Sequence, residues 1–335
     1  MTPVFTIWSD AELHPAAVAA LDGRARLIRS GSRYGSGDSV AGMEQADGVL
    51  AGGGFALTDE TVRRAGRLTV VARLGTGIDN IDLDAASRHG ICVTHTPDAP
   101  TVSTAEFAVG LMLCVARRMK IADRALSTGR PLAPWEATGF DLSERTLGLV
   151  GLGRIGSRVA QLARAFGMSV IAHDPGVSPD WAAELDVELT DELMTLLRRT
   201  DVLSIHVPLN AGTRGLIGKR ELASLRPRAI VVNVSRGPIV DAAALVDALD
   251  AGHLAGAGID VWDFEPPEPP TPLLRRDNVV ATPHIAAMTD EGRARSNVTA
   301  VEQVLSVFDG VRPTGLVNSQ VWPHRRRLAE DRTDE

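Results

Sequence analysis

Short apolar runs alternate with helical patterns along most of the chain. In the first hundred residues the apolar runs are VFTIW (4–8), RARLI (24–28), GVLAGG (48–53), LTVVARLG (68–75) and GICVTH (90–95). Strands that alternate with helices are typical of α/β proteins with a parallel sheet, because each parallel connection needs a crossover. The amino-terminal part is therefore predicted to form one parallel sheet.

A second series of the same kind follows a helical segment. Apolar residues recur at helical spacing from 101 to 126, and the proline- and glycine-punctuated stretch 129–143 around Trp135 predicts a loop or arm. The later apolar runs span residues 146–151, 168–174, 201–207, 229–235, 254–261 and 278–283. A last helical pattern covers 289–308. We expect a second parallel α/β sheet here.

Composition and charge fit a cored protein of two globular units. The 335 residues are 44% hydrophobic and 23% charged, which is too long for one ordinary core and too apolar for a disordered chain. The net charge of -7 is spread along the sequence, and the basic cluster 325–327 lies in a tail with four acidic residues. Nucleic-acid binding is not expected, because no basic face is available for phosphates. The tail from Pro323 onward, 323–335, is predicted to be disordered.

The cysteines and the amino terminus indicate a cytoplasmic protein. Cys92 lies in an apolar run and Cys114 in a helical pattern, so both are interpreted as core residues rather than as a disulfide pair or metal ligands. The sequence begins without a basic segment followed by a long apolar run, and no stretch reaches the roughly 18 apolar residues of a membrane span. No metal site and no membrane partner are expected.

A glycine motif at 151–156 indicates a dinucleotide site. Gly151, Gly153 and Gly156 form a G-x-G-x-x-G with Arg154 and Ile155 between them, directly after the run TLGLV and before a helical pattern. The glycines permit a tight turn, a close approach of the pyrophosphate and packing of helix on strand, and the helix N-terminus offers N–H groups to the anion. Asp174 ends the next apolar run, where a carboxylate would bind the ribose hydroxyls of NAD and repel the 2′-phosphate of NADP.

Three further polar groups follow strand ends in the same series. Arg236 follows the run 229–235, Glu265 follows 254–261 and His284 follows 278–283. The carboxyl ends of parallel strands form the ligand crevice, and an arginine fork for a carboxylate, a proton-carrying histidine and a carboxylate that orients it make a coherent catalytic set. Taken singly, Arg236 could form a surface ion pair, Glu265 could be a solvated acid, and His206 could be a hydrogen-bonded histidine at a strand end.

These motifs together resemble the D-isomer-specific 2-hydroxyacid dehydrogenases over roughly Leu50 to Phe308. The segments that carry the resemblance are LGTGIDNIDLDAA, GLVGLGRIGSRVA, LSIHVPLNAGTRGLI, VVNVSRGPIVD, GAGIDVWDFEP and TPHIA. The resemblance implies that Arg236, Glu265 and His284 are catalytic. It implies backbone N–H groups for the substrate at Gly75, Thr76 and Gly77, and a contact of Asp260 with the nicotinamide carboxamide. The other implied cofactor contacts are Thr104, His206, Pro208, Thr213, Val234, Ser235, His284 and Ala286.

The resemblance also implies the architecture: two Rossmann-like or flavodoxin-like doubly wound domains of the α/β class, with the active-site cleft between them. Residues 1–98 and 286–322 would form a discontinuous substrate domain, and 99–285 the NAD-binding domain. Family members are commonly homodimers through the region from Thr101 to Ser143.

The implied reaction is hydride transfer between NAD and a small 2-keto or D-2-hydroxy acid. Phosphoglycerate dehydrogenases usually carry basic side chains in the loop that reads AGGGFALTDE (51–60) here, so a substrate without phosphate is expected, with Gly53 and Phe55 as contacts. The chain also ends soon after the last helix, which leaves no expected room for a regulatory domain. Formate dehydrogenases carry Gln at the position of Glu265. Phosphite dehydrogenases and NAD(H)-sensing corepressors share the catalytic set. Both stay open as alternatives, and so does a phosphoglycerate dehydrogenase.

Overall fold

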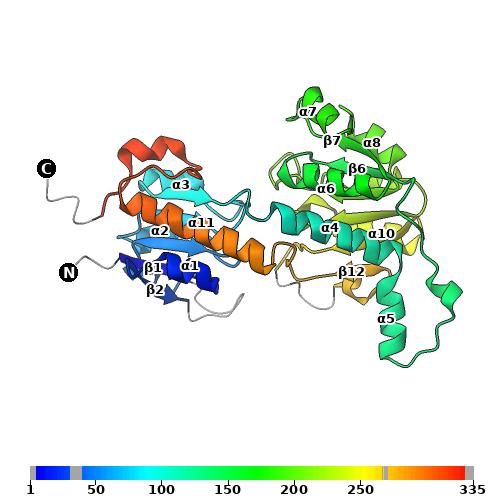
Figure 1. The fold of residues 1–335 in the computed structure, drawn as a ribbon, viewed down its shortest axis with the longest axis horizontal. Helices are drawn as coiled ribbons and strands as arrows, with labels where there is room; N and C mark the ends of the chain where they lie inside the picture. Colours follow the sequence, from blue (N-terminus) through cyan, green and yellow to red (C-terminus); the bar gives the residue numbers. More distant parts are fainter. Residues whose placement is uncertain (1–4, 31–39, 266, 268–270, 329–335) are drawn as a thin grey trace. The chain divides into compact units, whose positions relative to one another are not determined.

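The chain folds into two compact α/β units. The computed structural model describes residues 5–30, 40–265, 267 and 271–328. The first unit combines Met1–Pro100 with Met288–Glu335, and the second unit is Thr101–Ala287. Each unit has a central sheet with helices on both faces (Figure 1). The division lies within two residues of the boundaries expected for the two domains.

The sheet of the first unit has five parallel strands in the order β2-β1-β3-β4-β5. This is the flavodoxin-like order, in which the chain reverses direction across the sheet at β1 and β3. The strands are β1 (Phe5–Ser9), β2 (Ala25–Arg29), β3 (Gly48–Ala51), β4 (Val70–Arg73) and β5 (Cys92–His95). Helices α1 (Pro15–Ala20) and α11 (Asp290–Phe308) cover one face, and α2 (Asp59–Arg64) and α3 (Leu83–Arg88) cover the other. Two 3-10 turns, Met43–Gln45 and Ser319–His324, complete the unit.

The sheet of the second unit has seven parallel strands in the order β12-β11-β10-β9-β6-β7-β8. From β8 to β11 this follows the Rossmann order, and the switch point lies between β6 and β9. The strands are β6 (Thr146–Val150), β7 (Ser169–His173), β8 (Glu188–Leu189), β9 (Val202–Ile205), β10 (Ala229–Asn233), β11 (Leu254–Ile259) and β12 (Val279–Ala281).

Helices close both faces of this second sheet. On one face lie α4 (Thr101–Ala116), α6 (Arg154–Ala165) and α7 (Pro179–Glu184), and on the other α8 (Leu193–Arg199), α9 (Lys219–Ala223) and α10 (Ala242–Asp250). The central strands are apolar throughout because both faces are covered, as in β10, whose five residues are all buried. Gly258 of β11 lets α4 pack closely, since a Cβ there would lie 2.9 Å from the Leu111 Cβ.

The predicted fold class is confirmed, and each predicted apolar run overlaps a strand. The two-residue strand β8 was not predicted, because two residues carry no readable alternation. The helix expected over 101–126 is in fact two helices, α4 and α5 (Met119–Ser127), separated by Arg118 in the left-handed conformation with φ +52°. No glycine or proline marks this break in the sequence. Helix α5 and the following segment to residue 143 project from the second unit (Figure 1).

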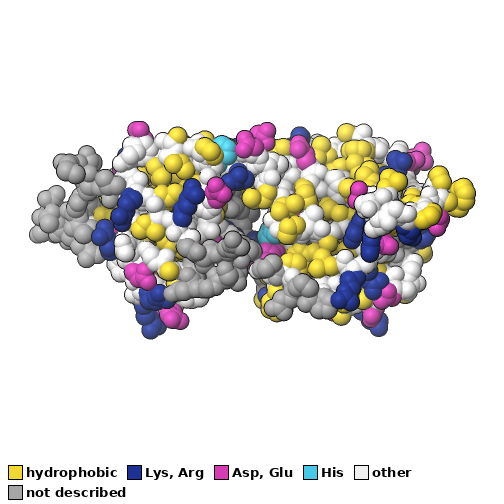
Figure 2. Space-filling model, turned by 90° about the horizontal axis from the view of Figure 1, so that it is seen from below, with side chains coloured by type: hydrophobic (Ala, Val, Ile, Leu, Met, Phe, Trp, Pro, Cys, Tyr) yellow, Lys and Arg dark blue, Asp and Glu magenta, His cyan; other side chains and the backbone are white. Residues whose placement is uncertain are grey.

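Charged side chains of both signs are mixed on the face shown in Figure 2. This distribution agrees with the absence of a basic cluster from the body of the sequence. In the ranges that the structure describes, no helix is long and apolar enough to cross a membrane.

The expected disorder from Pro323 onward is wrong for residues 323–328. The Arg326 N–H donates to the Gly90 carbonyl at 2.7 Å, and its guanidinium donates to the Ala65, Gly66 and Leu68 carbonyls at 2.9, 2.9 and 3.1 Å. The Arg325 guanidinium lies 3.9 Å from the centre of the Trp322 ring. Charge alone suggested a solvated tail, but Arg326 satisfies carbonyl groups that follow α2. Residues 329–335 lie outside the described part.

We expect Arg326→Gln to destabilise the first unit. The change removes a charged donor shared by three carbonyls, and such bonds contribute about 1.5–3 kcal/mol. Denaturant unfolding should show that loss in the transition of the first unit, whereas Arg312→Gln, an exposed change in the same unit, should leave the transition in place. Equal unfolding of both variants and the wild type would show that the carboxyl-terminal segment adds no stability.

Candidate functional site

A histidine and a glutamate meet where β11 and β12 end. His284 Nδ1 lies 2.6 Å from Glu265 Oε2, and the side chains are 35% and 21% exposed. β11 and β12 are neighbours in the parallel sheet, so their carboxyl ends lie at the same edge. The sequence prediction that these two groups interact is therefore realised as a short contact between them.

Glu265 is ionised in this arrangement. Burial would raise the pKa of Glu265, but the hydrogen bond and the charge of His284, the Trp262 N–H at 3.2 Å and the charge of Arg236 outweigh burial and lower the pKa below its usual value. A carboxylate that remains charged holds the imidazole by one nitrogen and leaves the other nitrogen available. The pair can thus carry and orient a proton.

The backbone of His284 is left-handed, with φ +55°. A residue other than glycine in this region costs about 1–3 kcal/mol and persists only where its surroundings hold it. Asp260 supplies that hold, because its backbone carbonyl accepts the His284 N–H at 2.7 Å. Its carboxylate accepts the Thr282 hydroxyl at 2.6 Å and the Ile285 and Ala286 N–H groups at 2.9 Å each.

Asp260 was predicted to meet the nicotinamide carboxamide, and that contact stays a prediction. In the structure the residue has no exposed surface and its two carboxylate oxygens bind the 282–286 loop. Asp260 directly follows β11, the neighbour of β12 in the sheet, and therefore lies next to the loop that leaves β12. The structure gives Asp260 the task of holding the loop that carries His284.

Arg236 lies in a turn that Asn233 closes. The Asn233 amide donates to the Arg236 carbonyl at 2.9 Å, and its side-chain oxygen accepts the Ser235 N–H at 3.0 Å. Gly237 brings this turn against the one after β11, because a Cβ there would lie 2.2 Å from the Trp262 carbonyl carbon. The turns that carry Arg236 and Glu265 are therefore in contact.

Asn233 and Trp262 were missed in the sequence. The Trp262 indole donates to the Thr282 carbonyl at 2.9 Å, so it fastens the loop of His284 from the other side. For Asn233 a signal existed, because an Asn at a strand end commonly accepts the backbone N–H two residues further on and so closes its own turn. For Trp262 the sequence offers no such signal, since its partner lies 20 residues away.

The glycine motif forms a cradle at the start of α6. Gly151 has φ +98°, and a Cβ on Gly156 would lie 2.2 Å from the Gly151 carbonyl oxygen, so the first and third glycines are required by backbone packing. A Cβ on Gly153 would meet nothing within 4 Å. The first intrahelical bond runs from the Ser157 N–H to the Gly153 carbonyl, and the N–H groups of Ile155 and Gly156 have no acceptor within the helix. The residues present therefore fit a dinucleotide pyrophosphate.

Asp174 lies beside this cradle, as predicted for the acid that binds ribose. One carboxylate oxygen accepts the Leu152 N–H at 2.8 Å and the other accepts the Gly176 N–H at 2.9 Å. A carboxylate has further acceptor positions for two hydroxyl groups. The acid is thus fixed against the glycine loop before any ligand binds.

The segment after β9 borders the same loop. The backbone of His206 lies against Gly151, its Nε2 is 2.9 Å from the Ser204 hydroxyl, and burial lowers the pKa of His206 to about 4. The ring is therefore neutral near pH 7 and already has a partner. The Thr213 hydroxyl donates to the Pro208 carbonyl at 2.6 Å, and the Ser235 hydroxyl donates to the Val207 carbonyl.

The predicted contacts Thr104, Val234 and Ala286 are 5%, 7% and 4% exposed, which leaves them little surface for a ligand.

Two predicted substrate contacts in the first unit need correction. Phe55 has no exposed surface, and its ring packs 5.5 Å from the Trp8 ring in the core, so the predicted contact of this side chain with substrate is wrong. Gly53 beside it is exposed. The Gly75 N–H already donates to the Thr96 hydroxyl at 2.9 Å. Among the described residues, the N–H groups of Thr76 and Gly77 have no acceptor and so stay available.

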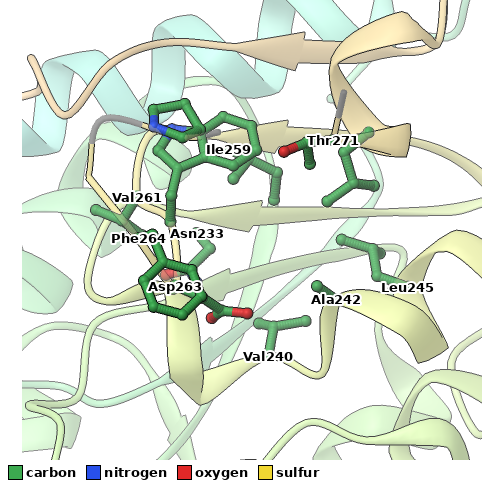
Figure 3. A pocket seen from close by; sticks show the side chains of 13 residues that line it. Asn233, Val240, Ala242, Leu245, Ile259, Val261, Asp263, Phe264 and Thr271 are labelled. Carbon is green, nitrogen blue, oxygen red and sulfur yellow. The ribbon is translucent and has the colours of Figure 1, made fainter. Parts of the chain in front are cut away.

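A cavity of about 170 Å³ lies where β10 and β11 end (Figure 3). Its walls are mainly apolar, and Asn233, Asp263 and Thr271 are its polar members. Among its described lining residues there is none of Arg236, Glu265 and His284, so the cavity is separate from that set. Across the described ranges, no group of three or more His, Cys, Asp or Glu side chains could hold a metal ion.

Comparisons with known proteins agree with this geometry. Residues 109–286 match the family model "D-isomer specific 2-hydroxyacid dehydrogenase, NAD binding domain". The chain is 38% identical to a D-3-phosphoglycerate dehydrogenase of Methanocaldococcus jannaschii over 85% of this chain and 54% of that protein. It is 42% identical to a glyoxylate reductase of Thermofilum pendens over 78% of each. The chain spans about half the length of the phosphoglycerate dehydrogenases that it matches.

Solved structures show the same fold. A D-lactate dehydrogenase from Aquifex aeolicus, solved with NAD and lactic acid, superposes with a TM-score of 0.79 at 28% identity and covers 91% of this chain and 96% of its own. The matching family model describes an NAD-binding domain, so NAD is the cofactor that the second unit is built for. The chain belongs to the D-isomer-specific 2-hydroxyacid dehydrogenase family.

Proposed function

We propose that this protein is an NAD-dependent oxidoreductase that interconverts a small 2-keto acid and the corresponding D-2-hydroxy acid. The observation that carries the proposal is the His284–Glu265 pair, 2.6 Å apart, at the strand-end edge of an NAD-binding domain. A histidine fixed by an ionised glutamate suits the transfer of one proton to or from an oxygen.

Each group has a distinct role in this proposal. NADH supplies the hydride that reduces C2 of the keto acid. His284, held by Glu265 through Nδ1, donates a proton from Nε2 to the carbonyl oxygen, and Arg236 binds the substrate carboxylate with its planar fork. In the oxidative direction His284 takes the proton back from the hydroxyl. Asp260 and Trp262 keep the loop of His284 in its left-handed conformation, so the ring does not have to be ordered at each turnover.

We propose a substrate without a phosphate group. The relatives are named for phosphoglycerate, glyoxylate and lactate, which share a carboxylate next to the reacting carbon. The loop AGGGFALTDE (51–60) contains no basic residue that could bind a phosphate. Oxidation of NADH should be measured against glyoxylate, hydroxypyruvate, pyruvate, phenylpyruvate and branched 2-keto acids, and repeated with NADPH. Tight NADH binding without turnover of any of them would favour an NAD(H)-sensing protein instead.

His284→Asn should reduce kcat by about 10²- to 10⁴-fold, the usual contribution of general acid catalysis. Asparagine tolerates the left-handed backbone, so the loop and NADH binding should be preserved while the proton donor is lost. The measurement is steady-state kinetics on the best substrate, with NADH affinity measured by fluorescence titration.

Arg236→Lys serves as the companion variant. It keeps the charge but loses the planar fork, so KM for the keto acid should rise while NADH affinity stays constant. A wild-type kcat in His284→Asn would remove the histidine from the mechanism, and an unchanged KM in Arg236→Lys would remove the arginine.

We propose NAD rather than NADP as the working cofactor, because the Asp174 carboxylate would repel a 2′-phosphate. Gly153→Ala then tests the cradle: Gly153 has an extended backbone and open space around it, so alanine should not affect folding. Its methyl group would occupy the approach path of the pyrophosphate, and NADH affinity should fall about tenfold or more.

Gly156→Ala is the matched comparison. Its methyl group would collide with the Gly151 carbonyl, so this variant should lose stability of the second unit as well as NADH binding. If Gly153→Ala bound NADH as tightly as the wild type, the pyrophosphate would not approach this glycine.

We propose that the protein forms a homodimer through α5 and the segment that follows it. Leu126 and Trp135 are 85% and 77% exposed on this projecting part, and exposed apolar side chains of this size commonly mark interfaces. Leu126→Glu/Trp135→Arg should shift the mass measured by light scattering toward that of a monomer. Val311→Arg, at an exposed apolar position of the first unit, should not. A wild-type mass equal to one chain would rule the dimer out.

A further inference from the structure

Three successive carbonyl groups of the loop after β4 have partners within the first unit. The Gly75 carbonyl accepts the Thr96 N–H at 3.0 Å, the Thr76 carbonyl lies 3.1 Å from His95 Nδ1, and the Gly77 carbonyl accepts Arg73 Nε at 3.0 Å. In a trans peptide the N–H group points away from the carbonyl of the same peptide unit, so the N–H groups of Thr76, Gly77 and Ile78 point away from these partners.

Two of those N–H groups are available. The Gly75 N–H is bonded to Thr96 Oγ1 and the Arg73 carbonyl, but within the described residues the N–H groups of Thr76 and Gly77 have no acceptor. Thr76 is exposed and Gly77 is half-buried. Backbone donors are rarely left without a partner, so this pair is suited to an anion.

Arg73 lies underneath this loop. It ends β4 and is 8% exposed, and its Nη1 donates to the Ala51 carbonyl at 2.9 Å while its Nε holds Gly77. One guanidinium thus joins the end of β3 to the loop after β4. Asp10, which follows β1, accepts the Gly52 N–H, and burial raises its pKa against the opposing effects of that bond and of the Arg73 charge.

These groups surround the switch point of the first sheet. β1 and β3 are neighbours, and the chain continues from them toward opposite edges. Ligands of doubly wound sheets bind outside the strand ends at this place. Arg73 and Asp10 therefore underlie the part of the first unit where a ligand is expected on topological grounds alone.

We propose that Arg73 is a positioning residue for the substrate: by binding the Gly77 carbonyl it holds the end of the loop whose Thr76 and Gly77 N–H groups receive the carboxylate of the 2-keto acid. The inference rests on the proposed function for the identity of that anion. Arg73 itself is buried and does not touch the substrate. Its charge, buried beneath the loop, adds to the attraction of the two N–H dipoles for an anion.

Arg73→Met removes both backbone contacts of the guanidinium. We expect KM for the best 2-keto acid to rise about ten- to hundredfold, the range for loss of charged hydrogen bonds, with kcat within about threefold of the wild type. NADH affinity should not change, because the glycine cradle belongs to the second unit. Arg73→Lys should recover part of the loss, because it keeps the charge and one donor. Arg63→Met, an exposed arginine of the same unit, is the matched control.

A second variant distinguishes a loss of substrate affinity from a loss of folding stability. Removal of Arg73 leaves Asp10 without its neighbouring charge, so Asp10→Asn/Arg73→Met should restore stability while keeping the Gly52 N–H bonded. The raised KM should persist in the double variant. A folded single or double variant with wild-type KM would overturn the role of Arg73, and so would equal losses of kcat, substrate affinity and NADH affinity.

Hydrogen exchange with oxalate separates this inference from the proposed reaction. Oxalate presents a carboxylate but cannot be reduced by NADH, and it should slow exchange of the Thr76 and Gly77 amides in the wild type and not in Arg73→Met. If no 2-keto acid were turned over while this protection was seen, the proposed reaction would fail and the anion cradle would stand. If turnover were found without protection, the cradle would be wrong.

Discussion

The arrangement of the second unit depends on one buried carboxylate. Asp260 directly follows β11, has no exposed surface and accepts hydrogen bonds from a hydroxyl and two N–H groups of the loop after β12, while its own carbonyl accepts a third N–H. A buried carboxylate without hydrogen-bond donors would be strongly unfavourable, so the loop must adopt a conformation that supplies these donors. The left-handed backbone of His284 is the conformation that satisfies them, and the contact of its ring with Glu265 follows from that backbone.

The same constraint recurs in the first unit with opposite polarity. There a buried arginine, Arg73, binds the carbonyl group at the end of β3 and a carbonyl group of the loop after β4, whereas Asp260 binds donors. In both units a charged residue at the last position of a parallel strand, or just after it, organises the neighbouring loop. Because all strands of each sheet point the same way, their ends present many unpaired backbone groups at one edge. One buried charged side chain can form hydrogen bonds with several of these groups.

The sequence predicted the elements better than the contacts. Apolar runs located the strands because buried parallel strands must be apolar on both faces, and the glycine motif located the start of α6 because only glycine fits beside Gly151. The sequence also predicted the pairing of His284 with Glu265, because both residues follow strand ends of the same sheet. It could not reveal that Phe55 points into the core, that Arg326 joins the tail to the first unit, or that Asp260 is enclosed, since each depends on contacts between distant parts of the chain.

The left-handed histidine has a consequence for how this sequence can change. Glycine and asparagine adopt such a backbone more readily than histidine does, so either residue at position 284 would relieve local strain. Selection for stability alone would therefore favour loss of the imidazole. The presence of histidine at this position is therefore better explained by its side chain than by its backbone, and it marks a position where stability and activity are in conflict.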